Sequence, residues 1–492
     1  MTVALQDYDA TGLAALIADG SLSAAEVLDA TLARIDAAEP RINAIAVDLR
    51  ERGREQSAGP IAGPFAGVPF LLKDIFQEYA GARMTMGALP LKDHVAKTTS
   101  AYVERCRRAG LVIIGATTTP ELGLKATTET MLHGATRNPW NLDHTPGGSS
   151  GGAAAAVAAG YVPMAGASDG GGSIRIPAAY CGLFGLKPSR GRVSEGPVLG
   201  EGWEGAVCTH ALTRSVRDSA AMLDVLAGAE PGDPFVITQP ERPFAAELDH
   251  DPGRLRIGFS VRSPVGGRVD PEMIEAVHKT AVLLESLGHQ VEEAEPSIDG
   301  GLLARCYMGL YFGHVAAMTA RIRRETLCAA SSFHPDTRAL ALLGRAMSAG
   351  AFVELRAHWN GFARALGEFH AHYDLFLTPT TALGPARIGA LDTPRPVQLL
   401  STVIDRLGAG RALLKSGIVD ELSFKNLERT PFTQLANLTF VPAMSVPLHQ
   451  GPDGLPVGVQ FVARFGAEAT LLRLAAQLER AAPWSTRRAF RI

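Results

Sequence analysis

Three short stretches of the sequence carry the residue types that acyl transfer requires. GVPFLLKD, at 67–74, contains Lys73; TPGGSSGGAAAA, at 145–156, contains Ser149 and Ser150; SDGGGSIRIPA, at 168–178, places Ser173 directly after three glycines. Consecutive glycines let backbone N–H groups point into one concavity, which is what the stabilisation of a developing oxyanion needs. A lysine serves as a general base once burial lowers its pKa, and Lys73 follows an apolar run. These patterns favour a serine nucleophile with a lysine base.

Ser150 also fits a second pattern, the G-x-S-x-G nucleophile elbow, with Gly148 and Gly152 on either side. In that motif the serine stands between a strand and a helix. The small residues from Ala153 onward suit a helix, but the preceding NPWNLDHTPGG contains two prolines and several turn formers, which favour a loop. Because no strand is expected before Ser150, the sequence disfavours an α/β-hydrolase triad built on this serine.

Other chemistries have less support. No phosphate-binding G-x-x-x-x-G-K-[ST] motif occurs, and no G-x-G-x-x-G follows an expected strand. His370 and His372 form an H-x-H pair of the kind found in metal-dependent amidohydrolases, but they precede the strand expected at 373–381 and resemble a helix C-terminus. A metal-dependent amidohydrolase and a catalytically silent binding protein are the alternatives to a serine enzyme. We expect no metal and no cofactor.

Taken together, GVPFLLKD, GGSSGG and SDGGGSIRIPA resemble the amidase signature family of serine hydrolases. The resemblance covers nearly the whole chain, most weakly at 300–430, and includes TTTPELG, GATRNPWN, CGLFGLKPSRGRVS, LTPT and NLTFVPAMSVPLHQGPDGLPVGVQF. It implies an amidase that cleaves the C–N bond of a small linear, cyclic or aryl amide, or of a carbamate, through a serine acyl-enzyme. GATRNPWNL, GVPFLLKD and GAEPGDPF resemble members that act on small linear or cyclic amides, such as nylon-oligomer cyclic dimer hydrolases.

The resemblance also implies roles for individual residues. Lys73 matches the family's lysine base, Ser173 matches its nucleophile, and Ser149 matches the bridging serine with a cis peptide bond. These three form a Ser-cisSer-Lys triad, which leaves Ser150 outside. By the same resemblance, an oxyanion hole is formed by the backbone N–H groups of Gly170, Gly171, Gly172 and Ser173, and Asp169 and Arg175 form a pair that braces the loop. Gly123 and Lys125 are expected near the substrate. A helical stretch with Cys306, Tyr307 and Phe312 forms either a pocket wall or ordinary helix packing.

Composition limits the partners of the chain. The 492 residues carry a formal net charge of −3, from 47 basic and 50 acidic residues, which gives no electrostatic reason to expect nucleic acid or an anionic membrane. The five cysteines form no C-x-x-C pair, the N-terminus lacks the pattern of a secretory signal, and no apolar run is long enough to span a membrane. We therefore expect a cytoplasmic monomer or homodimer whose partner is a small amide.

The catalytic residues require an α/β framework to position them. Strands and helices alternate along the chain, which indicates an α/β fold, and the resemblance implies a central mixed β-sheet flanked by helices on both faces. We predict one domain over 1–492, with its signature core at about 61–215 and a less regular helical insertion at about 300–431. Strands are expected at 68–72, 109–119, 255–260, 289–296, 373–381 and 455–463, and helices within 22–45, 214–229, 270–288, 300–373 and 466–481.

Overall fold

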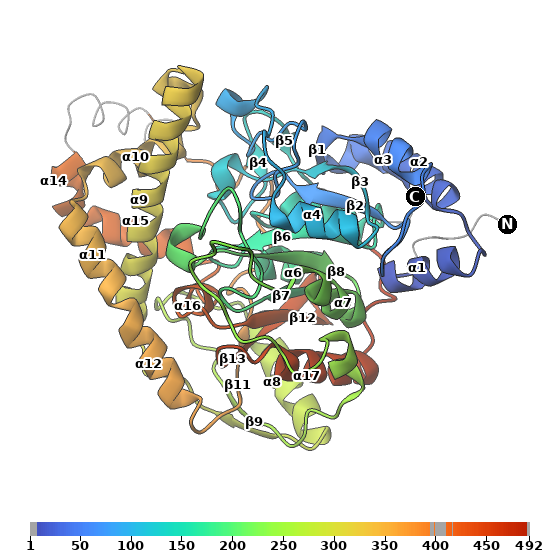
Figure 1. Ribbon diagram of the computed structural model, residues 1–492. Helices are drawn as coiled ribbons and strands as arrows, with labels where there is room; N and C mark the ends of the chain where they lie inside the picture. Colours follow the sequence, from blue (N-terminus) through green and yellow to red (C-terminus); the bar gives the residue numbers. More distant parts are fainter. Residues whose placement is uncertain (1–6, 394–397, 399–409, 416, 490–492) are drawn as a thin grey trace.

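One large mixed sheet organises the computed structural model, which describes residues 7–393, 398, 410–415 and 417–489 (Figure 1). Within these residues eleven strands pair in the order β1-β3-β2-β6-β8-β7-β12-β13-β11-β9-β10. β3, β2 and β6 are parallel neighbours, as are β11, β9 and β10, and the other pairings are antiparallel. The strands are β1 (Ile45–Asp48), β2 (Pro69–Lys73), β3 (Val112–Thr117), β6 (Met164–Asp169), β7 (Phe184–Lys187), β8 (Cys208–Thr213), β9 (Arg256–Phe259), β10 (Gln290–Glu293), β11 (Leu375–Pro379), β12 (Ala443–Gln450) and β13 (Pro456–Ala463). A separate hairpin pairs β4 (Glu129–Thr130) with β5 (Gly134–Ala135).

Helices cover both faces of this sheet, as the alternating side chains of the strands require. In β2, Phe70 and Leu72 join one hydrophobic core with α4, α7, α8 and α17, whereas Leu71 joins another with α2, α5 and α6. The predicted α/β fold with a mixed sheet between helices is confirmed. These helices are α1 (Ala10–Ala18), α2 (Ala24–Ile42), α3 (Arg50–Ser57), α4 (Ala101–Arg108), α5 (Gly151–Ala158), α6 (Arg175–Cys181), α7 (Val216–Leu226), α8 (Pro271–Ser286) and α17 (Glu468–Ala481).

A third hydrophobic core lies in a group of helices on one side of the sheet, at the left of Figure 1. It unites α9 (Gly300–Thr326), α10 (Pro335–Ala346), α12 (Trp359–Phe369) and α15 (Ile418–Leu427), with α11 (Ala349–Ala357), α14 (Gly410–Lys415) and α16 (Gln434–Leu438) packed around them. Most of these helices fall in the predicted helical insertion at 300–431, although residues 394–397, 399–409 and 416 of that range lie outside the described part of the chain.

One of the two strands that carry the site, β6, is hard to detect from sequence periodicity. β6 reads MAGASD and is buried along its whole length, so it shows neither alternation nor bulky β-branched residues. We predicted no strand there. β2 and β6 are parallel neighbours, and their carboxyl ends therefore meet at the same edge of the sheet. Lys73 ends β2 and Asp169 ends β6, which brings the lysine stretch and the glycine stretch together.

Candidate active site

Lys73 lies buried at the carboxyl end of β2. Only 1% of its surface is exposed, and its Nζ donates to the hydroxyl oxygens of Ser149 and Ser168, each at 2.9 Å. Burial lowers the pKa of Lys73 from 10.5 to about 7, although the carboxylate of Asp169 acts in the opposite direction. An amine with this pKa is largely neutral slightly above pH 7. Lys73 therefore has the protonation state that a general base needs.

The two serines of TPGGSSGGAAAA have different surroundings. Ser149 follows a cis peptide bond from Gly148 and contacts the lysine, and its carbonyl oxygen accepts a hydrogen bond from Thr119 Oγ1 at 2.9 Å. The hydroxyl of Ser150 is bound instead to the backbone of Ser168, where it accepts from the N–H and donates to the carbonyl oxygen. No strand occurs within 138–150, all of which the structure describes. This turn therefore lacks the strand that precedes an elbow serine, and Ser150 ties the turn to β6.

Ser173 lies in the loop between β6 and α6. Its carbonyl oxygen accepts a hydrogen bond of 3.3 Å from the N–H of Ser150. The two serine-bearing loops are therefore in direct contact, although they are well separated in the sequence. Ser173 is half-buried, whereas Lys73 and Ser149 are almost fully buried. This gradient of exposure suits a nucleophile that meets a substrate, backed by a base that is shielded from water.

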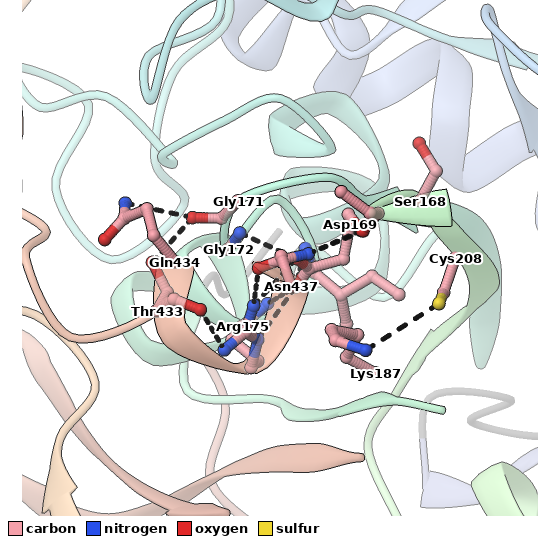
Figure 2. A network of polar contacts seen from close by, with 12 residues as sticks. Ser168, Asp169, Gly171, Gly172, Arg175, Lys187, Cys208, Thr433, Gln434 and Asn437 are labelled. Atoms are coloured by element: carbon pink, nitrogen blue, oxygen red, sulfur yellow. Dashed lines mark hydrogen bonds and ion pairs between the residues drawn. The ribbon is translucent and has the colours of Figure 1, made fainter. Parts of the chain in front are cut away.

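A buried ion pair holds the glycine loop in shape. The guanidinium of Arg175 donates to both carboxylate oxygens of Asp169, at 2.8 and 2.9 Å (Figure 2). The same carboxylate accepts from the N–H groups of Gly172 at 2.6 Å and Ile174 at 3.1 Å. Burial alone would raise the pKa of Asp169, but the charge and hydrogen bonds of Arg175 hold it well below its usual range. Asp169 is therefore a permanent negative charge around which the loop is folded.

A segment far along the chain completes this network, and we did not predict it. Thr433 Oγ1 donates to the carbonyl oxygen of Gly171 at 2.6 Å, and Gln434 Nε2 donates to the same oxygen at 3.2 Å (Figure 2). Asn437, on α16, accepts from Arg175 at 2.6 Å and donates to the carboxylate of the ion pair. The NLTF stretch that begins at Asn437 matched the family in the sequence, but no spacing rule linked it to the glycine loop.

The three glycines have different environments. The N–H of Gly172 points to Asp169, so it is already satisfied within the protein. Among the described residues, the N–H groups of Gly170, Gly171 and Ser173 donate no hydrogen bond. A methyl group on Gly171 would lie 1.7 Å from the hydroxyl oxygen of Tyr307, on α9, so this position has no room for a side chain. The loop thus presents unused N–H donors next to Ser173.

Gly123 and Lys125 lie beside the turn that contains Gly148 and Ser149. Gly123 has a positive φ of 72°, and a Cβ placed on it would lie 3.5 Å from Ser149 Oγ. A Cβ on Gly148 would lie 2.5 Å from the carbonyl oxygen of Lys125, so the two backbones are in tight contact. The side chain of Lys125 points elsewhere, because its Nζ forms an ion pair with Asp336 at 2.6 Å. The structure thus brings these two positions to the Gly148–Ser149 turn through their backbones.

Ser168 is a polar neighbour of the lysine that sequence reasoning missed. It belongs to the SDGGGS stretch, but its contact with Lys73 depends on the pairing of β2 with β6. The H-x-H pair lies elsewhere: His370 caps α12, and its Nδ1 lies 3.1 Å from the carbonyl oxygen of Tyr373. Within the described chain, no group of three or more His, Cys, Asp or Glu residues could hold a metal ion, and no helix could cross a membrane.

Comparisons with known proteins agree with this arrangement. The amidase family model matches residues 26–472. A 6-aminohexanoate-cyclic-dimer hydrolase of Pseudomonas sp. (strain NK87) is 40% identical, with 98% of this chain and 96% of the relative covered. A solved structure of a 6-aminohexanoate cyclic dimer hydrolase with substrate has a TM-score of 0.90 at 36% identity, covering 99% of both chains. A bacterial aryl acylamidase of the amidase signature family has a TM-score of 0.83 at 27% identity, covering 97% of both chains. The chain therefore belongs to the amidase signature family and is a hydrolase that acts on amide C–N bonds.

Proposed function

We propose that this amidase works through an acyl-enzyme on Ser173, with Ser149 as the proton bridge and Lys73 as the base. The contact of 2.9 Å between Lys73 Nζ and Ser149 Oγ carries this proposal, because it lies in a buried site where the lysine has a pKa of about 7. The contact of the Ser150 N–H with the Ser173 carbonyl supports the placement of the nucleophile beside the bridge.

In the first half-reaction, Ser149 passes the Ser173 proton to neutral Lys73 while Ser173 Oγ attacks the amide carbonyl carbon. The developing oxyanion accepts hydrogen bonds from loop N–H groups. We assign this role to Gly170, Gly171 and the nucleophile itself, and we leave out Gly172 because its N–H is bound to a carboxylate. The proton then returns through the bridge to the leaving nitrogen, and the C–N bond breaks. Water attacks the ester by the same route and releases the acid.

The substrate is a small linear, cyclic or aryl amide. Among the similar proteins are a hydrolase of the 6-aminohexanoate cyclic dimer and an aryl acylamidase, and this range supports a small amide without choosing one. Carbamates present the same acyl carbon to a nucleophile and belong to the substrate panel. We place Gly123 and Lys125 near the substrate, because Gly123 lies beside Ser149 and the carbonyl oxygen of Lys125 lies beside Gly148.

We extend the proposal to the location and the domain organisation of the enzyme. All five cysteines are free thiols, which supports a reducing cytoplasmic location. We also propose that the whole chain, 1–492, acts as one domain, because the described strands of the single large sheet extend from residue 45 to residue 463.

The test combines a serine probe with a panel of amides. Wild-type protein should be labelled by a fluorophosphonate and should release amine from at least one primary amide, anilide, cyclic amide or carbamate. Ser173→Ala should lose the label and at least about a thousandfold in kcat, since the nucleophile defines the pathway. A chelator should change neither result. Near-normal turnover by Ser173→Ala, or loss of activity with the chelator, would contradict the proposal.

A further inference from the structure

A cavity lies next to the loop that contains Gly123 and contacts Ser149. Its walls come from the segment 121–125, from β4 and from α10, and Figure 1 places α10 near this hairpin. Apolar side chains from Leu124, Met131 and Leu340 form part of the lining. The charged and polar lining residues are Glu121, Lys125, Glu129, Thr130, His334, Asp336 and Thr337. None of these residues belongs to the triad or to the ion pair that braces the glycine loop.

Glu121 leaves an unused acceptor in this cavity. The residue is only 7% exposed. Its Oε1 accepts a hydrogen bond of 2.8 Å from the N–H of His334, but its Oε2 is buried and has no hydrogen-bond partner among the described residues. Burial raises the pKa of Glu121, whereas the hydroxyl of Thr337, the N–H of His334 and the charge of Lys125 oppose this increase. A buried carboxylate oxygen without a partner is costly, unless a ligand supplies the missing donor.

Carboxylates outnumber cations around this cavity. Lys125 neutralises one of them through its ion pair of 2.6 Å with Asp336. In the part of the chain that the structure describes, the carboxylate of Glu129 accepts one hydrogen bond, from the N–H of Gly389 at 2.8 Å. Two further charges act on the lining residues. The negative charge of Asp392 raises the pKa of Glu129, and the positive charge of Arg338 lowers the pKa of His334, so their formal charges cancel. The cavity therefore has an excess of negative charge and an open acceptor, which together suit a cationic donor.

The position of the cavity indicates which part of a substrate would reach it. The Cβ position of Gly123 lies 3.5 Å from Ser149 Oγ, and Glu121 and Lys125, each two residues from Gly123 in the sequence, line the cavity. In the proposed reaction Ser149 returns the proton to the leaving nitrogen, so the leaving amine lies on the bridging serine's side of the scissile bond. A chain attached to that nitrogen would extend towards this cavity.

We propose that the cavity binds an ammonium group carried by the leaving amine, so that the substrate class is a monoacylated aliphatic diamine. Glu121 would accept from that ammonium, and Glu129 would add longer-range attraction. The reaction consumes one water and one such amide and yields a carboxylic acid and the free diamine, with no other reactant. This inference rests on the proposed function, because it needs Ser149 to define the leaving-group side.

The experiment compares three series of acetamides with matched alkyl chains of three to six methylenes on nitrogen, ending in ammonium, methyl or carboxylate. Wild-type kcat/KM should be about ten- to a hundredfold higher for ammonium than for methyl at the best length, as one charge-assisted hydrogen bond provides. Carboxylate ends should be worse than methyl. Glu121→Gln keeps an acceptor for His334 and should lower the ammonium-to-methyl ratio about tenfold. Glu55→Gln, which changes an exposed glutamate on α3, should keep the wild-type ratio.

Two results would overturn the inference: equal wild-type rates for ammonium and methyl ends, or an unchanged ratio in Glu121→Gln. Neither would affect the proposed function as long as neutral amides are hydrolysed in a Ser173-dependent manner. If no series is hydrolysed, calorimetry decides instead. Hexane-1,6-diamine should bind folded Ser173→Ala protein at least about tenfold more tightly than it binds the variant that also carries Glu121→Gln. Equal binding to both variants would overturn the inference.

Discussion

The pKa of Lys73 makes the pH dependence of acylation the sharpest test of the site. Burial places this pKa at about 7 instead of 10.5. The neutral amine is the active base, so activity should rise with pH through about 7. A base with a pKa of 7 is about 9% neutral at pH 6 and about 91% neutral at pH 8, which gives about a tenfold increase in kcat/KM between these values. A lysine with its ordinary pKa would give about a hundredfold increase over the same interval and no plateau.

The assay is kcat/KM for one neutral amide or anilide, measured from pH 5 to pH 10 in buffers of constant ionic strength. We expect a rise to a plateau with a midpoint near 7. Asp74 needs a control, because burial raises its pKa to about 6 and its titration falls in the same range. Asp74→Asn should keep the midpoint near 7. A wild-type profile that is flat between pH 6 and 8, or that still rises tenfold per unit above pH 9, would refute Lys73 as a buried neutral base.

Three further predictions concern the loops around the triad. Ser149→Ala should lower kcat about 10²- to 10⁴-fold, whereas Ser150→Ala should mainly reduce the free energy of unfolding, by about 1–2 kcal/mol; the opposite ranking in kinetics and urea unfolding would restore the elbow interpretation. Arg175→Met leaves a buried carboxylate unpaired and should cost about 3–5 kcal/mol in urea unfolding, and a loss below about 1 kcal/mol would contradict the bracing role. Gly171→Ala places a methyl group 1.7 Å from the Tyr307 hydroxyl, so it should reduce kcat. Adding Tyr307→Ala should restore part of that loss, and strictly additive effects would speak against this contact.

The sequence predicted the sheet best where strands are apolar and bounded by clear turns. The strand expected at 68–72 is β2 (Pro69–Lys73), and the strand expected at 455–463 is β13 (Pro456–Ala463). The helix expected within 22–45 is α2, whose N-cap Ser23 and Glu26 form a capping box. β1, β6, β8 and β12 were not predicted. β6 and β8 are buried throughout, and β6 is built from small residues, so neither shows the alternation that marks a half-exposed strand.

The candidate site was also predictable only in part from the sequence. Local motifs identified Lys73, Ser149 and Ser173 as a lysine and serines of the type and spacing that acyl transfer uses. The assignment of the bridge to the first of two adjacent serines came from the family resemblance. In the structure Ser149 is the serine of that pair that contacts the lysine, whereas Ser150 binds the backbone of β6. Adjacent residues of one type differ in this way because a turn points successive side chains in different directions.

The sequence by itself indicated the amidase signature family and its amide hydrolysis, because the motifs that resemble that family are short and contiguous. Only the tertiary structure decided the pKa of Lys73, the hydrogen bonds that hold the glycine loop and the surroundings of Glu121. The low pKa of Lys73 requires the burial that the sheet provides. The glycine loop is held by Thr433 and Asn437, which lie more than 250 residues away, and Glu121 faces a cavity closed by α10. Desolvation and long-range hydrogen bonds depend on which distant segments pack together, and no local spacing in the sequence encodes that packing.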